Sequence, residues 1–404
     1  MIAESVKNSL AGSSMIRKMF EEGINLKKQH GADNVFDFSL GNPDVDPPKA
    51  FNDVFLKLAA EDEKGSHGYM PNAGYPWVRE AISGKVSREQ NVDADASCVI
   101  MAAGAAGGLN VVFKTICNPG DEIIVSKPFF MEYRHYAANS QAKLIEVDVL
   151  DDFNLNLSAI SAALSSKTAA VLVNSPNNPT GKIYSASVLD GLSALLTEHG
   201  NRSGRFPYLV SDEPYREISY DVDVPPLLSC YKDSIVVQSY SKNLSLPGER
   251  IGYIAVNPRI SDKDDLVNGL ILCTRIFGFV NAPALMQRIV GYLVEEKIDI
   301  SVYEKRRDTF MKTLDAAGIE YLIPDGAFYL FCKVPKKKEL GKADGEQAAN
   351  DAVFAEHLKK HLILGVPGTG FGKPGWIRFA YCSDEKIIKA SAGAFKAAME
   401  SWQA

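Results

Sequence analysis

The sequence predicts an α/β protein built on a mainly parallel β-sheet. In the middle of the chain, short apolar runs of strand length alternate with segments whose apolar residues recur on one helical face. This alternation is typical of βα units, which place consecutive strands parallel in one sheet. A change of pattern near residue 285 indicates a second, smaller domain, and 404 residues are enough for both.

Composition narrows the class of protein. An apolar fraction of 46% and a charged fraction of 23% are those of an ordinary globular chain. The net charge of -6 argues against general binding to nucleic acid or to anionic membranes. No apolar window is long enough to cross a bilayer, and the N-terminal stretch lacks the apolar core of a signal peptide. We therefore expect a cytoplasmic protein that binds neither nucleic acid nor membranes.

The cysteines agree with that location. They are widely scattered, with no CxxC pair and no spacing typical of a metal site, so we expect reduced thiols and no bound metal. They stand at Cys98, Cys117, Cys230, Cys273, Cys332 and Cys382.

The elements follow in chain order. Apolar periodicity predicts a helix over 15–30 and another that begins near Leu109. The clearest strands are expected at 123–125, 169–173, 208–210 and 235–237. A long helical pattern over 283–317 then gives way to "GAFYLFCKV" (326–334). We expect a large domain over 50–285 and a small domain formed by 1–49 and 286–404.

Polar residues follow three of the predicted strands. The strand at 169–173 runs into "NSPNNPTG" (174–181), the next into "SDEPY" (211–215), and the third into "SYSK" (239–242). In open parallel sheets, ligands bind beyond the carboxyl ends of the strands. A binding site is therefore expected where these three segments meet.

Part of this site has the composition of an anion site. The small residues of 101–108 would let a phosphate approach backbone N–H groups at a helix N-terminus. Arg250 could add a bidentate contact, and Ser239 and Ser241 could add hydroxyl donors. Glycine-rich helix starts are common, however, and an isolated arginine often forms a surface ion pair instead.

Asp212 and Lys242 suggest a specific chemistry. Each could form a structural salt bridge, because a carboxylate after a buried strand needs a cationic partner. Together with phosphate donors and tyrosines, however, they suit a lysine that forms a Schiff base with pyridoxal phosphate. Asp212 would face the pyridine nitrogen and Lys242 would move the substrate Cα proton. Asn178 and Tyr215 would bind the phenolic oxygen, and Phe130 would stack on the ring.

Three motifs now match one family in content, order and spacing: "NNPTG" (177–181), "SDEPY" (211–215) and "SYSKNLSLPGERIGY" (239–253). Through them the sequence resembles the class I/II aminotransferases, pyridoxal-phosphate enzymes of fold type I in the aspartate aminotransferase superfamily, from about residue 15 to 400. The resemblance implies a large domain with a mainly parallel seven-stranded sheet and a smaller α+β domain. It also implies a homodimer with shared active sites.

The resemblance assigns roles position by position. Cofactor contacts are implied for Lys242 (Schiff base), Asp212 (pyridine nitrogen), Asn178 and Tyr215 (phenolic oxygen), Phe130 (stacking), and Arg250, Ser239, Gly104, Ala105 and Ala106 (phosphate). "SLGNPD" (39–44) resembles the substrate loop, with Gly41 near the substrate carboxylate, and Arg378 in "WIRFAYC" (376–382) matches the arginine that binds the α-carboxylate. Tyr69 matches the tyrosine that reaches the cofactor phosphate of the neighbouring subunit.

Two positions depart from the family pattern. The phosphate loop has alanines where relatives often have hydroxyl or amide side chains, so backbone N–H groups must supply more of the contact. Arg275 falls one position earlier than the arginine of a dicarboxylate-specific branch. A shift of one residue can turn the side chain away, so the preferred amino acid stays open.

The leading functional prediction is a transaminase that works by ping-pong half-reactions. An L-amino acid would leave its nitrogen on the cofactor, and a 2-oxo acid, 2-oxoglutarate in our prediction, would collect it. A lyase on the same scaffold, such as a carbon–sulfur β-lyase or an aminocyclopropane-carboxylate synthase, would use the same residues. A regulator with a DNA-binding helix-turn-helix module is not expected, because the aminotransferase pattern begins almost at the N-terminus. A catalytically inactive binding protein is an alternative too, but every expected catalytic position is filled.

Overall fold

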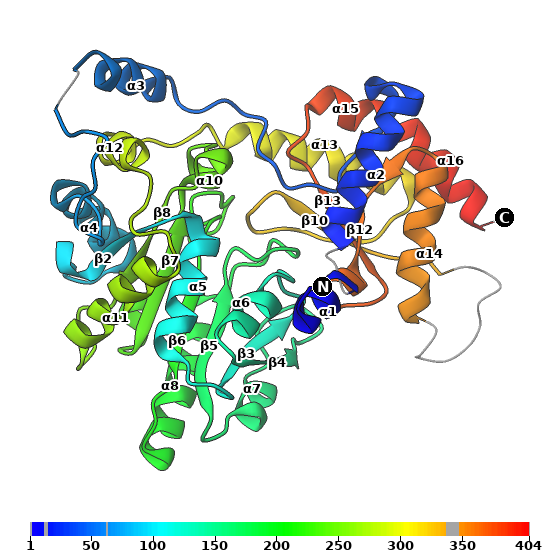
Figure 1. The fold of residues 1–404 in the computed structure, drawn as a ribbon. Coiled ribbons are helices and arrows are strands. Elements are labelled where there is room, and N and C mark those ends of the chain that lie inside the picture. Colours follow the sequence, from blue (N-terminus) through cyan, green and yellow to red (C-terminus); the bar gives the residue numbers. More distant parts are fainter. Residues whose placement is uncertain (1, 12–14, 62–63, 337–346, 404) are drawn as a thin grey trace.

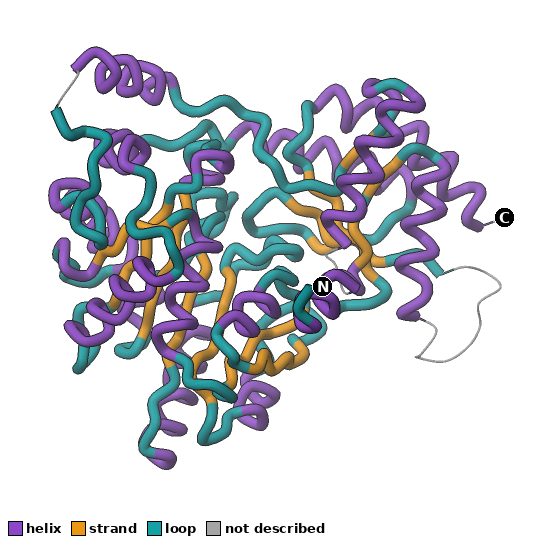
Figure 2. Tube along the Cα trace, in the orientation of Figure 1, coloured by secondary structure: helices purple, strands orange, loops and turns teal. Residues whose placement is uncertain are grey.

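The structure, a computed structural model, describes residues 2–11, 15–61, 64–336 and 347–403. Figure 1 shows a large sheet between helices, and a second group of helices and short strands beside it. Figure 2 shows the same division, with the strands of each group enclosed by helices. No helix in these described ranges is long and apolar enough to cross a membrane.

The large sheet has seven strands in the order β2-β8-β7-β6-β5-β3-β4. Only β8 runs antiparallel to its neighbours, so the predicted mainly parallel α/β sheet is confirmed. The strands are β2 (Val99–Ala102), β3 (Glu122–Lys127), β4 (Lys143–Asp148), β5 (Thr168–Asn174), β6 (Tyr208–Asp212), β7 (Ser234–Ser239) and β8 (Gly252–Val256).

Helices cover both faces of this sheet, because its central strands are apolar on both sides. Ile123 and Val125 pack with one group of helices, whereas Ile124 between them packs with the other. The first group is α5 (Gly104–Ile116), α6 (Tyr133–Asn139) and α11 (Lys263–Ile276). The second is α4 (Pro76–Gln90), α7 (Leu157–Ala163), α8 (Ala186–Ser203), α9 (Leu227–Cys230) and α12 (Ala284–Tyr292).

A second core surrounds a four-stranded sheet of order β12-β13-β10-β9. Its strands are β9 (Tyr321–Leu322), β10 (Tyr329–Lys333), β12 (Val366–Pro367) and β13 (Trp376–Ala380), and β1 (Phe36–Asp37) pairs separately with β11 (Ile363–Leu364). The helices beside them in Figure 1 are α2 (Met15–His30), α13 (Ser301–Ala317), α14 (Gln347–Lys360), α15 (Glu385–Ala390) and α16 (Ala392–Gln403). The division into domains at residues 50 and 285 stays a prediction.

Three further α-helices lie in the described residues. They are α1 (Glu4–Ala11), α3 (Lys49–Glu61) and α10 (Tyr240–Asn243). The last of these, α10, begins directly after β7 and carries the predicted Schiff-base lysine.

Two expected helices differ from the observed ones. The helix expected near Leu109 begins at Gly104, because small residues let its first turns pack closely on the sheet: a Cβ on Gly108 would lie 2.7 Å from Val237 Cγ1. The long pattern over 283–317 is two helices, α12 and α13. Between them the backbone N–H of buried Ile298 donates to the Asn243 carbonyl at 2.9 Å, a tertiary contact that a continuous helix would not allow.

Gly252 should be essential for this packing. A Cβ at Gly252 would lie 2.3 Å from the Gln238 carbonyl oxygen of the paired strand, so Gly252→Ala should lower the free energy of unfolding by about 1–3 kcal/mol. Urea denaturation would measure this. Gly248→Ala is the matched control, since no atom would lie within 4 Å of its Cβ, and its effect should stay within about 0.5 kcal/mol. Equal stability of the two variants would contradict the packing argument.

Candidate active site

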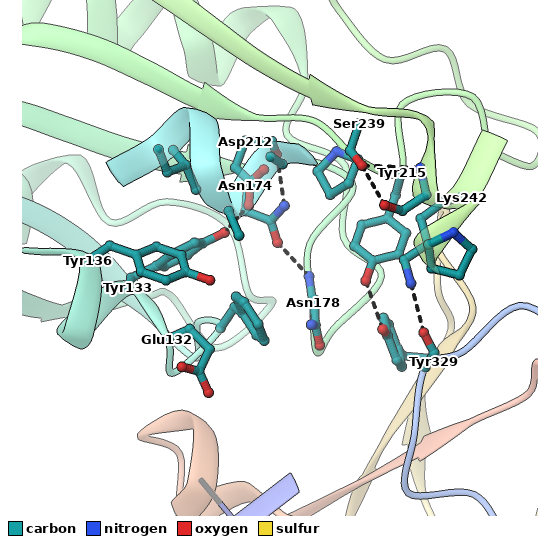
Figure 3. A pocket seen from close by; sticks show the side chains of 18 of the residues that line it. Glu132, Tyr133, Tyr136, Asn174, Asn178, Asp212, Tyr215, Ser239, Lys242 and Tyr329 are labelled. Carbon is teal, nitrogen blue, oxygen red and sulfur yellow. Dashed lines mark hydrogen bonds between the residues drawn. The ribbon is translucent and has the colours of Figure 1, made fainter. Parts of the chain in front are cut away.

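A cavity of about 460 Å³ lies at the carboxyl ends of β5, β6 and β7. Its wall is completed by the first turn of α5, the start of α6, the 40–41 loop, and Tyr329 and Arg378 from the second sheet. Figure 3 shows how these side chains converge. The predicted meeting of the three strand ends is therefore found in the structure.

Strand register places the first polar side chains. Asn174 ends β5 and pairs with Asp212, which ends β6. The Asn174 side chain donates from Nδ2 to the Asp212 carbonyl at 2.8 Å and accepts from the Asn178 N–H at 2.7 Å. The loop after β5 is thus fixed against the end of β6.

Asp212 is a buried carboxylate with one free oxygen. Tyr133 Oη donates to Oδ2 at 2.6 Å, whereas Oδ1 has no hydrogen-bond partner in the described part of the chain. Burial raises the pKa of Asp212 to about 7, although the hydrogen bond from Tyr133 acts in the opposite direction. An additional N–H donor facing Oδ1 would stabilise the charged carboxylate.

Lys242 lies across the cavity from Tyr133 and Tyr136 (Figure 3). The side chain of Ser239 caps the short helix α10 by accepting from the Ser241 N–H at 3.1 Å, so β7 leads directly into Lys242. Lys242 Nζ donates to the Gly41 carbonyl at 2.8 Å. Burial lowers the pKa of Lys242 to about 8, and the positive charge of Arg378 also lowers it.

The first turn of α5 and Arg250 meet at one corner of the cavity, where phosphate binding is predicted. Gly104 has φ +71, and a Cβ there would lie 2.9 Å from Arg250 Nη2, so glycine is needed where the two segments meet. Ser239 Oγ lies 2.6 Å from Ser241 Oγ beside them. Ala105 and Ala106 line the cavity but offer only backbone N–H groups as donors.

Arg378 is a buried cation, only 1% exposed. It donates from Nη1 to Asn178 Oδ1 at 2.9 Å and from Nη2 to the Ser39 carbonyl at 2.5 Å. Nε has no partner in the described residues, and burial lowers the pKa of the guanidinium. A carboxylate in the cavity would satisfy Nε and neutralise the charge.

The predicted phenolic-oxygen ligands lie between these groups. Since Arg378 occupies Asn178 Oδ1, the other polar group of that side chain is its Nδ2 donor. Tyr215 Oη lies 2.8 Å from Tyr329 Oη, and both tyrosines are buried. Burial, and then the neighbouring Tyr329, raises the pKa of Tyr215, so its hydroxyl stays protonated and able to donate.

Two predicted site residues occupy contrasting positions. Phe130 lines the cavity, with its ring edge-on to Tyr133 at a centroid distance of 5.6 Å. Tyr69 is 90% exposed and does not line the cavity of its own chain. Within one chain, Tyr69 therefore does not join the other predicted phosphate contacts.

Sequence reasoning missed several residues that line the cavity. Glu132, Tyr133 and Tyr136 follow Phe130 within two helical turns, a spacing that could have indicated a shared face. Asn174 lies within a quoted motif and could have been chosen from it. Tyr329 had no local signal, since its hydroxyl contacts that of Tyr215 across 114 positions of the chain, within the second core that both tyrosines share.

These residues fit pyridoxal phosphate. The free Asp212 Oδ1 suits a protonated ring nitrogen, and the corner at Gly104 and Arg250 suits a phosphate. Lys242 supplies an amine whose lowered pKa favours its neutral, nucleophilic form. Arg378 remains available for a substrate carboxylate.

Known proteins resemble this chain over its whole length. Residues 33–392 match the family described as aminotransferase class I and II. A probable aspartate aminotransferase of Methanocaldococcus jannaschii is 30% identical over 99% of this chain and 100% of that protein. An aspartate aminotransferase of Pyrococcus abyssi is 29% identical over 96% of each.

Solved structures give the same result. An amino transferase from Eubacterium rectale superposes with a TM-score of 0.92 at 34% identity, covering 100% of both chains. The Thermus thermophilus aspartate aminotransferase with maleate gives a TM-score of 0.82 at 25% identity, covering 96% of this chain and 97% of that one. With the match of the family itself, these likenesses show that the chain belongs to the class I and II aminotransferases and is a pyridoxal-phosphate-dependent transaminase.

Proposed function

We propose that the cavity at the ends of β5, β6 and β7 transfers the amino group of an L-amino acid to 2-oxoglutarate. One observation carries the assignment: a single cavity holds an amine of lowered pKa, together with a carboxylate oxygen and a guanidinium nitrogen that have no hydrogen-bond partner among the described residues. The aspartate aminotransferases among the relatives support the choice of acceptor.

Each residue has a distinct part in binding. Lys242, Asp212, Asn178 and Tyr215 would hold the ring, and Phe130 would pack against its face. Gly104, Ala105, Ala106, Ser239 and Arg250 would bind the phosphate. When bound, the cofactor supplies an aldehyde that accepts nitrogen and a ring that withdraws electrons. Asp212 increases that withdrawal, because its carboxylate stabilises a proton on the ring nitrogen.

We assign the orientation of the substrate to Arg378, Asn178 and Gly41. The Arg378 guanidinium would bind the α-carboxylate, and its two existing hydrogen bonds hold it in place. Gly41 would admit the carboxylate close to the backbone, where its carbonyl already accepts from Lys242 Nζ at 2.8 Å. The substrate Cα would then lie near this lysine.

Proton transfer is assigned to Lys242. Nζ is neutral above about pH 8, so it can take the Cα proton of the bound amino acid and hold it. The same group can then deliver the proton to a neighbouring carbon. The apolar Phe328 ring, 5.3 Å from Nζ, limits the access of water.

A homodimer completes the proposal. Tyr69 is too exposed to serve its own cavity, and a partner's cavity would use it as a phosphate ligand. The exposed apolar side chains Ile276, Phe277 and Phe279 offer surface for an interface. We also propose a cytoplasmic location, which the six free cysteines support.

The first prediction for this site follows from the lowered pKa of Lys242. The rate at which apoprotein captures pyridoxal phosphate should rise with pH around a midpoint near 8, because only the neutral amine reacts. Stopped-flow absorbance would measure it. Arg378→Gln removes a positive charge and should raise the midpoint, whereas exposed Arg202→Gln should not change it. A midpoint near the ordinary value of 10.5 would contradict the assignment.

A second prediction concerns turnover. L-Glutamate without an oxo acid should bleach the visible band of the wild-type holoenzyme, and Lys242→Ala should lose at least about 10²–10⁴-fold in kcat because the base is gone. Lys232→Ala is the control, since Lys232 lies exposed before β7 whereas Lys242 follows it. An active, folded Lys242→Ala variant, with unchanged circular dichroism, would refute the proposed mechanism.

The third prediction tests the shared site. Sedimentation should detect a species of twice the chain mass, and Tyr69→Phe should weaken pyridoxal-phosphate affinity about tenfold by removing a hydrogen bond to a charged group. Equilibrium dialysis would measure the affinity. Tyr321→Phe, whose hydroxyl donates to Asp315 at 2.8 Å in the second sheet region, should have no effect on it. A monomer with full cofactor affinity would exclude the shared site.

A further inference from the structure

Glu132 is an acidic side chain that lines the cavity. Neither cofactor binding nor proton transfer, as proposed above, uses it. Among the described lining residues the carboxylates are Asp212 and Glu132, and only Asp212 faces the region assigned to the ring nitrogen. Figure 3 places Glu132 on the wall formed by Tyr133 and Tyr136, with its carboxylate turned away from Asp212. It therefore borders a part of the cavity that lies away from the Asp212 carboxylate.

A structural explanation for Glu132 is weak. It occupies the position before α6, where an acidic side chain often caps a helix, yet its carboxylate makes no capping hydrogen bond. The N–H groups of His135 and Tyr136 instead donate to its backbone carbonyl, both at 3.0 Å. In the described part of the chain no ion pair or side-chain hydrogen bond uses the Glu132 carboxylate.

The negative charge of Glu132 nevertheless affects a neighbouring tyrosine of the cavity. Burial, followed by the Glu132 carboxylate, raises the pKa of the Tyr136 hydroxyl, which also lines the cavity. Glu132 is half-buried, so bulk water screens its charge only in part. A charged group on a substrate side chain in this region would interact with it directly.

The cations that one chain contributes to the cavity already have proposed roles. Lys242, Arg250 and Arg378 are the basic residues among its described lining, and the proposed function uses them for the amine, the phosphate and the α-carboxylate. No basic residue of that lining remains to neutralise a second substrate carboxylate. The position that Glu132 occupies would instead oppose one.

We propose that Glu132 is a specificity-determining residue that disfavours amino donors with an acidic side chain and favours donors with a cationic one. The inference rests on the proposed function, because it takes Arg378 as the α-carboxylate site and thereby directs the substrate side chain toward α6. It separates this chain from the reaction named for its relatives, which are aspartate aminotransferases. The repulsion raises the concentration of L-glutamate and 2-oxoglutarate that the enzyme requires by about tenfold, but it does not prevent either from reacting.

Matched pairs of substrates isolate the effect of charge. L-Aspartate and L-asparagine have nearly the same shape but differ by one negative charge, and L-lysine adds one charged ammonium group to the carbon chain of L-norleucine. In Glu132→Gln the aspartate/asparagine ratio of kcat/KM should rise about tenfold, and the lysine/norleucine ratio should fall by a similar factor. Added salt should shrink both differences in the wild type.

Binding provides a readout that does not depend on turnover. Calorimetry with the holoenzyme should show that Glu132→Gln strengthens maleate relative to its monoamide, again about tenfold. Glu198→Gln is the control, because it removes the same charge from an exposed site on α8 and should leave every ratio unchanged. Thermal unfolding would verify that both variants are folded.

The possible outcomes are distinct. Opposite movement of the two kcat/KM ratios, absent in Glu198→Gln, supports the proposal. The proposal is overturned if both ratios stay constant. It is also overturned if both rise or both fall, as a change of cavity shape would cause. Failure of the proposed function would appear separately: Arg378→Gln would then leave kcat/KM unchanged for all the amino acids, whatever Glu132→Gln does.

Discussion

The pairing of β5, β6 and β7 is the constraint on which the site depends. Parallel pairing brings Asn174 beside Asp212, and β7 ends next to them at the serine that caps the lysine helix. Since side chains alternate across a sheet, a shift of one residue in either pairing would turn Asp212 away from the cavity. The buried apolar layers on both faces of the sheet prevent such a shift, because they would be exposed by it.

This rigid frame allows charges that would otherwise be unfavourable. Asp212 and Arg378 are buried, each with an atom that has no hydrogen-bond partner in the part of the chain that the structure describes, and the positive charge of Arg378 acts on Lys242. Burying such groups costs free energy, which the packing of two cores must offset. In return, the cavity presents a raised carboxylate pKa and a lowered amine pKa within one small volume, a combination typical of catalytic sites. Tyr133 moderates the first of these shifts through a single hydrogen bond.

Local pattern was a good guide where local forces decide the structure. The helix over 15–30 has the predicted bounds, and the four predicted strands lie within β3, β5, β6 and β7. It failed where tertiary contacts overrule propensity. Glycines at the start of α5 are helical because they allow contact with β7, and the pattern over 283–317 is interrupted where Ile298 bonds to the lysine helix.

By itself the sequence determined the α/β class, the family resemblance and the residues expected around a cofactor, because those residues follow strands directly and so share one edge of a sheet. Tertiary structure decided which of them meet, which are exposed and which distant groups join them. Tyr329 reaches Tyr215 from a strand of the second sheet, and Tyr69 points to solvent rather than to its own cavity. That the Glu132 carboxylate has no partner among the described residues also depends on the tertiary structure. Contacts between segments far apart in the chain depend on packing in three dimensions, which no local pattern encodes.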